Sequence, residues 1–244
     1  MLILGIESSA KAASAALCRD GELLGQYFQC AGLTHSRTLL PMAEELLHGT
    51  DTALGDLDGV AVAVGPGSFT GVRIGVAAVK GLCFGAEKPA AGVSTLEAMA
   101  WNGVNRGEGT LVCCCMDARR SQVYNALFER GTQMRRLCED RALSADELTA
   151  ELAARGAPVI FVGDGAQLCY NTCRDILPCA IAPACQLHLQ PAMAGAAAEQ
   201  AYAAGETALV KHNEIMPVYL RLPQAERERL ERERKMEHET DHRK

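Results

Sequence analysis

The stretch from Gly65 to Gly75 reads GPGSFTGVRIG and has the composition of a backbone anion cradle. It follows the apolar run 60–64, which predicts a buried strand, and it leads into 71–84, which predicts a helix. A glycine-rich turn of this kind exposes free amides, and the dipole of the following helix favours negative charge there. The same residues also build a tight strand-to-helix turn that binds nothing. The spacing alone leaves both interpretations open.

Hydroxyl and thiol side chains are candidates for nucleophiles. Ser68 and Thr70 stand at the predicted helix start, where such residues normally cap the first amides. An active nucleophile needs a base and a group that orients the base, and no His-plus-acid motif accompanies these residues or Cys18, Cys30 and Cys83. We therefore predict no catalytic residue in this chain.

Eleven cysteines are more than a chain of 244 residues usually has. Three are consecutive, at 113–115 in a strand-like run, so neighbouring side chains point to opposite faces. We interpret the cysteines as small buried hydrophobic residues in a reducing compartment. The alternative is a zinc site formed by Cys169, Cys173, Cys179 and Cys185. The spacing of these four cysteines matches no zinc-finger pattern. We predict no metal site.

The formal net charge is −6, whereas a protein that binds RNA alone usually has a basic surface. Any role on nucleic acid is therefore expected to depend on a partner. The N-terminal apolar run is too short for a signal peptide, and we expect no run long and apolar enough to span a bilayer. These features predict a cytoplasmic protein with no membrane partner.

The order of predicted elements repeats. The first half gives strands at 2–7, 14–18 and 23–29, a helix at 34–47, the strand 60–64, the helix 71–84, a strand at 90–93 and a helix at 94–101. The second half gives strands at 110–116, 122–128 and 133–137, a helix at 144–154, the strand 158–162, a helix from 165 through 177 and a helix at 192–204. A βββαβα unit that occurs twice predicts an α/β fold of two similar lobes with mixed sheets.

We place an N-terminal lobe at 1–103, a C-terminal lobe at 104–210 and a C-terminal segment with a charged helical tail at 211–244. Beyond residue 224 the chain is rich in both Arg and Glu and almost without apolar residues. A solvated helical tail and a docking helix for a partner both fit that composition.

The order of elements and five motifs resemble the TsaB (YeaZ) family within the actin, hexokinase and heat-shock chaperone superfamily. The motifs are ILGIESS at 3–9, HSRTLLP at 35–41, VGPGSFTGVRIG at 64–75, DARR at 117–120 with Val123-Tyr124, and PVYLR at 217–221. The resemblance covers about 1–222 and implies a duplicated fold of the actin-like ATPase and ribonuclease H type. It differs at Glu7, where the family usually has Asp.

The resemblance implies a non-catalytic scaffold subunit required to place threonylcarbamoyl on an adenosine beside the anticodon of tRNA. Its expected partners are a TsaD-like paralogue, which carries the metal and the transferase site, and a TsaE-like ATPase. tRNA is expected to bind only through the complex, and the isolated chain is a candidate homodimer. We expect this subunit to require no cofactor, with ATP and metal on the partners.

The resemblance also assigns candidate site residues. Glu7, Asp117 and Gly163 fall where relatives bind a nucleotide, and we interpret this cleft as degenerate because Glu replaces Asp and the loop at 117–119 lacks glycine. His35 has Leu39 one turn on, so the paralogue's pair of metal-binding His residues is absent.

The helices 34–47 and 71–84 have more apolar residues than one buried face needs. The resemblance implies that their remaining faces meet the same pair of helices in the TsaD-like paralogue or in a second copy of this chain. The predicted interface residues are His35, Leu39, Leu40, Met42, Leu46, Val72, Arg73, Val76 and Val79. The alternative function is a stand-alone ATP-dependent enzyme, or a glycoprotease-like peptidase, of the same superfamily.

Overall fold

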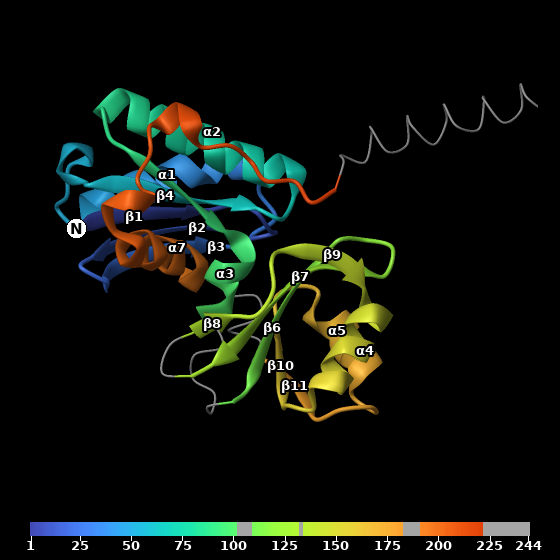
Figure 1. The fold of residues 1–244 in the computed structure, drawn as a ribbon. Helices are drawn as coiled ribbons and strands as arrows, with labels where there is room; N and C mark the ends of the chain where they lie inside the picture. Colours follow the sequence, from blue (N-terminus) through green and yellow to red (C-terminus); the bar gives the residue numbers. More distant parts are fainter. Residues whose placement is uncertain (102–108, 132–133, 183–190, 222–244) are drawn as a thin grey trace, which may run out of the picture.

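The computed structural model describes residues 1–101, 109–131, 134–182 and 191–221. The chain forms two lobes, each built on one mixed sheet (Figure 1). The predicted α/β fold of two similar lobes is confirmed.

The first sheet has the order β3-β2-β1-β4-β5, in which β1 runs antiparallel to β2 and parallel to β4. The strands are β1 (Leu2–Glu7), β2 (Ala13–Arg19), β3 (Glu22–Gln29), β4 (Gly59–Gly65) and β5 (Ala90–Ser94). Asp20 and Gly21 join β2 to β3 with φ of 51° and 81°, which is the left-handed pair that a tight hairpin needs. The helices α1 (His35–Gly49) and α2 (Phe69–Ala86) pack on one face of this sheet, and the 3₁₀ turn η1 (Leu54–Asp56) precedes β4.

The second sheet repeats this order as β11-β10-β6-β7-β8, and β9 also pairs with β7. Its strands are β6 (Leu111–Asp117), β7 (Gln122–Arg130), β8 (Met134–Arg136), β9 (Arg141–Ser144), β10 (Val159–Val162) and β11 (Cys179–Ile181). The helices α4 (Ala145–Arg155) and α5 (Ala166–Cys173) cover one face. Ser144 and Glu147 form the capping box that the sequence predicts. The predicted helix through 177 was too long, because α5 ends at Cys173.

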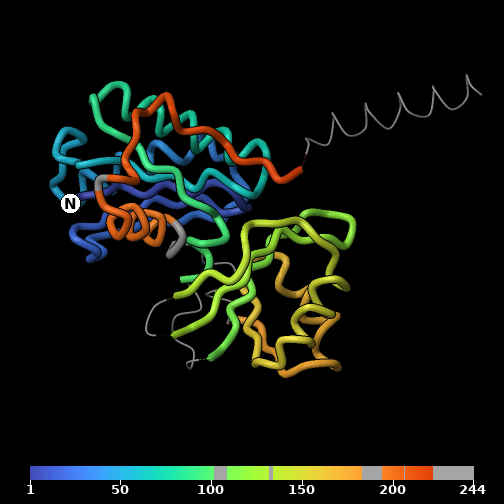
Figure 2. The backbone as a smooth tube through the Cα atoms, viewed as in Figure 1, coloured from blue at the N-terminus to red at the C-terminus, as the bar shows by residue number. Residues whose placement is uncertain are grey.

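Two helices cross between the predicted lobes. The helix α3 (Thr95–Ala100) packs Leu96 and Met99 on the second sheet, whereas α7 (Pro191–Ala204) packs on the first sheet. Figures 1 and 2 show α7 below the first sheet, on the side opposite α1 and α2. The predicted boundary at 103/104 lies in a stretch, 102–108, outside the described residues, and the divisions at 103 and 210 stay predictions. The packing shows that each sheet takes one covering helix from the other half of the chain.

After the 3₁₀ turn η3 (Gly205–Ala208), residues 209–221 form an extended segment that we call the C-terminal strap. It bridges to β5 through Val210 and Ala90, includes the short turn η4 (His212–Glu214) and then runs beside α2 toward the second lobe (Figure 2). The amide of Val218 donates to the carbonyl of Val64 at 2.8 Å. The strap is therefore hydrogen-bonded to β4 and to β5 of the first sheet. Residues 222–244, including the predicted tail, lie outside the described residues.

The expectation that no segment has the length and composition of a membrane span was wrong for α2. This helix is long and apolar enough by those two measures alone. Its residues Val72, Val76 and Val79 lie in the core of the first lobe, against the sheet. Their burial accounts for the apolar residues on one side of the helix, of which 33% is buried in all.

Candidate functional site

The glycines of the turn at 65–75 are required by the chain's own packing. A Cβ atom on Gly67 would lie 2.5 Å from the carbonyl oxygen of Ser9, and one on Gly71 would lie 2.1 Å from that of Ser8. One on Gly75 would lie 2.4 Å from the Oγ of Ser8. All three contacts are closer than real side chains tolerate, so the backbone after β1 fits against the start of α2 only because these positions are glycine.

Hydrogen bonds hold the two segments together. The amide of Ser68 donates to the carbonyl of Ser9 at 2.7 Å, and the hydroxyl of Ser8 donates to the carbonyl of Gly71 at 2.9 Å. The hydroxyl of Ser68 accepts from the amide of Gly71, which confirms its predicted capping role. Close packing of the turn against the residues after β1 therefore explains why glycines and Ser68 occupy these positions, and no bound anion is needed to explain them.

Glu7 lies beneath this contact and is almost fully buried. Its Oε1 accepts from the amide of Ser9, whereas its Oε2 has no hydrogen-bond partner within the described part of the chain. Burial raises the pKa of Glu7 to about 7. The carboxyl is absent from the lining of the cavity described next, so the predicted nucleotide-binding role of Glu7 has no open path to that cavity in this arrangement.

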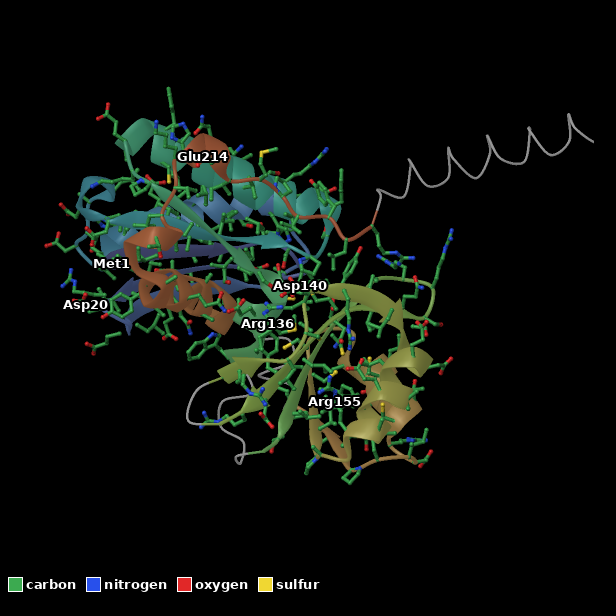
Figure 3. All side chains as sticks on the ribbon, viewed as in Figure 1. Met1, Asp20, Arg136, Asp140, Arg155 and Glu214 are labelled. Carbon is green, nitrogen blue, oxygen red and sulfur yellow. The ribbon has the colours of Figure 1, made fainter. Side chains whose placement is uncertain are left out.

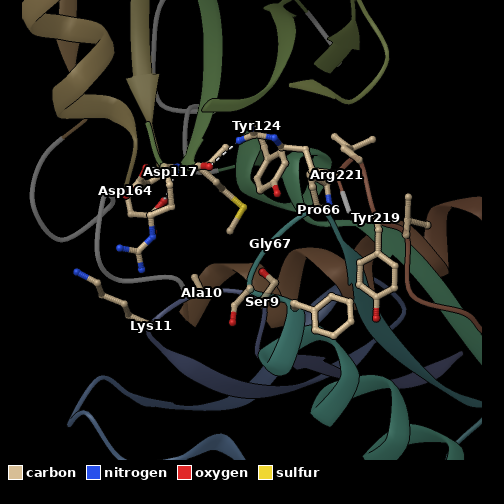
Figure 4. Close-up of a pocket in the computed structure, with 17 residues that line it drawn as sticks. Ser9, Ala10, Lys11, Pro66, Gly67, Asp117, Tyr124, Asp164, Tyr219 and Arg221 are labelled. Atoms are coloured by element: carbon tan, nitrogen blue, oxygen red, sulfur yellow. Dashed lines mark hydrogen bonds between the residues drawn. The ribbon is translucent and has the colours of Figure 1, made fainter. Parts of the chain in front are cut away.

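A cavity of about 420 Å³ lies between the lobes, at the ends of β1, β4 and β6 (Figure 4). The turns after those strands, the segment at 164 and the strap all line it. Asp117 is one lining residue, but Gly163 is not, and its neighbour Asp164 takes that place. Asp164 accepts from the amide of Asp117 at 3.0 Å, and burial raises its pKa while nearby Lys11 acts in the opposite direction.

Three consecutive residues after Asp117 adopt left-handed backbone conformations. Arg119, Arg120 and Ser121 have φ of 67°, 55° and 56°. Each such conformation costs a non-glycine residue roughly 1 kcal/mol. The loop therefore takes the backbone conformation that glycine adopts at least cost, although it contains no glycine. That the cleft is degenerate as a nucleotide site stays a prediction.

His35 has a local structural contact. Its Nε2 lies 2.8 Å from the carbonyl oxygen of Ala10 and so links the start of α1 to the turn between β1 and β2. Among the described residues, no three His, Cys, Asp or Glu side chains are grouped so that they could hold a metal ion. Cys169 and Cys173 lie in the core of the second lobe, and Cys185 lies outside the described residues.

Most of the predicted interface residues face inward. The structure places six of them in the core of the first lobe, and they are Leu39, Met42, Leu46, Val72, Val76 and Val79. Leu40 is 44% exposed, and Arg73 is also exposed. Six of the nine predicted interface residues therefore pack within this chain, and the partner interface itself stays a prediction.

The outer face of these helices, which we call the α1–α2 face, has a groove of about 560 Å³. Its apolar lining comes mainly from Leu40, Leu47, Leu54 and Leu82. Beside it, α2 exposes small residues at Ala77, Gly81 and Gly85. A Cβ atom on Gly81 or Gly85 would meet nothing within 4 Å, so packing within this chain does not require glycine there. Sequence analysis missed these residues, and the signal was Gly81 inside the predicted helix 71–84 with Gly85 directly after it.

Comparison with known proteins gives a consistent family. The model of the family TsaD, tRNA N6-adenosine threonylcarbamoyltransferase, matches residues 29–229. The tRNA threonylcarbamoyladenosine biosynthesis protein TsaB of Bacillus subtilis is 32% identical over 95% of this chain and 99% of its own length. The TsaB of Escherichia coli is 41% identical, but that match spans 53% of this chain and only 56% of the relative.

Among solved structures, YeaZ from Pseudomonas aeruginosa superimposes with a TM-score of 0.71 at 27% identity. The superposition covers 90% of this chain and 99% of that one. The sequence match to a full-length relative and the shared fold agree with the motifs at 3–9, 64–75 and 217–221. The chain therefore belongs to the TsaB (YeaZ) family.

Proposed function

We propose that this protein acts in tRNA threonylcarbamoyladenosine biosynthesis, the process for which its relatives in Bacillus subtilis and Escherichia coli are named. Its role is that of a non-catalytic scaffold that binds a TsaD-like transferase. ATP and metal belong to the partners, and this subunit needs no cofactor of its own. The observation that carries the proposal is the α1–α2 face, which is apolar and contains glycines that the chain itself does not need.

Glycine inside a helix costs about 1 kcal/mol relative to alanine, so two exposed glycines need a compensating contact. Small residues let the backbones of two helices approach closely, and the apolar groove beside them would accept side chains of the second helix pair. A TsaD-like protein is a suitable partner because the family model that matches this chain is that of the transferase itself. Two related folds can pair through equivalent helices.

Three further assignments complete the proposal. A TsaE-like ATPase joins the pair, and tRNA binds the complex and not the scaffold alone. In the absence of its partner, the same apolar face makes the chain a homodimer. The complex works in the cytoplasm.

Reconstitution with the partners tests the scaffold role. Leu40→Glu and Ala77→Glu place a charge on the α1–α2 face without touching the core, and we expect both to prevent co-elution with the TsaD-like partner and to abolish tRNA modification. Ile176→Glu is the matched control, because Ile176 is 60% exposed on the second lobe. Intact complexes with both α1–α2 variants would reject the interface.

A second function, an ATP-dependent enzyme or a peptidase of the same superfamily, has one observation in its favour. Arg119, the first residue of the left-handed turn at Arg119–Ser121, lines the cavity between the lobes together with Asp117. Calorimetry with ATP and Mg²⁺ on the isolated chain separates the two functions. The scaffold proposal expects no heat of binding, and micromolar binding that Glu7→Ala removes would favour the enzyme.

A further inference from the structure

The strap and the exposed side of α2 bring cationic and aromatic side chains onto one surface. We call this surface the cationic ridge, and its residues are Arg73, Lys80 and Phe84 of α2 together with His212, Tyr219 and Arg221 of the strap. Figures 1 and 2 show the strap beside α2 over this length. The ridge and the groove share no lining residue, but the ridge borders the α1–α2 face at Ala77, which lies on the same side of α2 as Arg73 and Lys80.

The cations of the ridge are hydrogen-bonded to neutral groups. The Nε of Arg73 donates to the hydroxyl of Tyr219 at 2.9 Å, and the Nζ of Lys80 donates to the carbonyl of Asn213 at 3.4 Å. Arg221 donates to the carbonyl of Ala118 at 2.7 Å. Within the described ranges, none of these three cations forms an ion pair.

Arginines of the second lobe behave differently. Those at 135, 136, 141, 155 and 174 all form ion pairs with Asp or Glu. Although the net charge of the chain is −6, no acidic side chain among the described residues pairs with Arg73, Lys80 or Arg221. These three cations therefore keep their positive charge available to an anionic partner.

Aromatic rings alternate with these cations. The guanidinium carbon of Arg73 lies 4.0 Å from the centre of the Phe69 ring, and that ring packs against Tyr219 with centroids 4.7 Å apart. Phe84 touches His212 edge-on at 5.6 Å and is 72% exposed, so a face of its ring is open to solvent. Open rings between cations suit stacked bases and their phosphates.

The geometry points to the cationic ridge as a contact surface for RNA, with phosphates on Arg73, Lys80 and Arg221 and an unpaired base on Phe84. This inference rests on the proposed function, which supplies tRNA as the RNA. Arg73 and Lys80 are about 10 Å apart along the helix axis, a reach that covers successive phosphates of one strand. Glu214, an exposed acid that Figure 3 labels beside α2, lies between His212 and Tyr219 along the strap, so the ridge also carries an acidic group.

Binding of an unmodified tRNA transcript to the complex with the TsaD-like partner, and to the full chain alone, tests the inference. We expect the Arg73→Glu/Lys80→Glu variant to weaken binding by the complex about tenfold and to lower the slope of log affinity against log salt by about 2. Phe84→Ala should weaken it about fivefold, with the salt slope unchanged. Arg73→Lys should keep most of the affinity, because it keeps the charge.

Arg174→Glu is the matched control, since it reverses an exposed arginine on the second lobe that is paired with Asp175. Thermal unfolding of each variant checks the fold. Wild-type affinity and salt slope in the Arg73→Glu/Lys80→Glu complex would overturn the inference. Failure of the same variant to bind the TsaD-like partner would also overturn the inference, because the ridge would then be a protein interface. Failure of the proposed scaffold role would be seen in a different experiment: the Leu40→Glu variant would still form the complex with the TsaD-like partner.

Discussion

The carbonyl oxygen of Ser8 lies so close to Gly71 that a Cβ atom there would be 2.1 Å away. Gly71→Ala therefore forces the backbone after β1 away from the start of α2. We expect the free energy of unfolding to fall by about 2 kcal/mol, the cost typical of overpacking a core. Denaturant unfolding of the isolated chain measures it.

The matched control is Gly81→Ala, ten residues along the same helix, where a Cβ atom meets nothing within 4 Å. That change should raise the free energy of unfolding by about 0.5–1 kcal/mol, because alanine favours the helix. Equal effects of the two substitutions would contradict the packing explanation of the turn.

Gly81→Leu tests the α1–α2 face in a different way. The isolated chain should unfold at the same or a higher denaturant concentration, since the side chain enters open space. Affinity for the TsaD-like partner should fall at least about tenfold, because a leucine holds the two helices apart. Denaturant unfolding gives the first number, and titration calorimetry gives the second. Tight binding by this variant would mean that the partner docks elsewhere.

The buried carboxyl of Glu7 gives a pH dependence of stability. Its pKa is raised to about 7 in the folded chain, against 4.5 for the free side chain. Below pH 4.5 both states hold the proton, so its contribution to stability is fully present there, and it is lost as pH rises toward 7. Integrated over that window, the loss is about 3 kcal/mol.

Glu7→Gln keeps the size and the acceptor but cannot ionise. Its stability should therefore fall less between pH 5 and pH 8 than that of the wild-type chain, by about 3 kcal/mol. Other titrating groups, such as Asp164, are common to both proteins and cancel in the comparison. Parallel stability curves for the two proteins would show that Glu7 does not hold this proton.

Arg136 joins α3 to the second sheet. It donates to Glu97 at 2.9 Å and to Asp140 at 2.7 Å, and Figure 3 shows Arg136 and Asp140 at this junction. Arg136→Ala leaves two acids without their partner, and we expect a loss of about 2 kcal/mol in thermal or denaturant unfolding. Arg135→Ala, which removes an exposed pair with Glu129, should change stability by less than about 0.5 kcal/mol. If the two substitutions lowered the free energy of unfolding equally, the contacts of Arg136 would not be what holds α3 on the second sheet.

Local signals predicted most of the fold. The Asp20-Gly21 hairpin, the cap at Ser68 and the capping box at Ser144 each depend on a few neighbouring residues, and all three are present in the structure. Thr34 occupies the N-cap position of α1, where threonine is a favoured residue, but its side chain makes no capping hydrogen bond. The short strands β9 and β11 were missed, because runs of three or four residues give little periodicity.

The candidate site was less predictable, because its features join residues far apart in sequence. Periodicity shows that α2 has a buried face, but not that the strap covers a second side of it. Composition marks residues 65–75 as a turn with special backbone needs, but the contact with Ser8 and Ser9 that explains those needs is nearly 60 residues away. The left-handed turn at Arg119 has no glycine to signal it.

The crossing of α7 has a consequence for how the protein is made. One face of the first sheet, including Ile3, Cys18 and Ala61, is covered by a helix that begins at residue 191. A ribosome releases that helix only after both sheets have been synthesised. The nascent N-terminal lobe thus shows a bare apolar face for most of translation, which is a surface that chaperones bind and that invites aggregation. A fragment that ends near residue 100 lacks α7, so this face of the first sheet stays exposed.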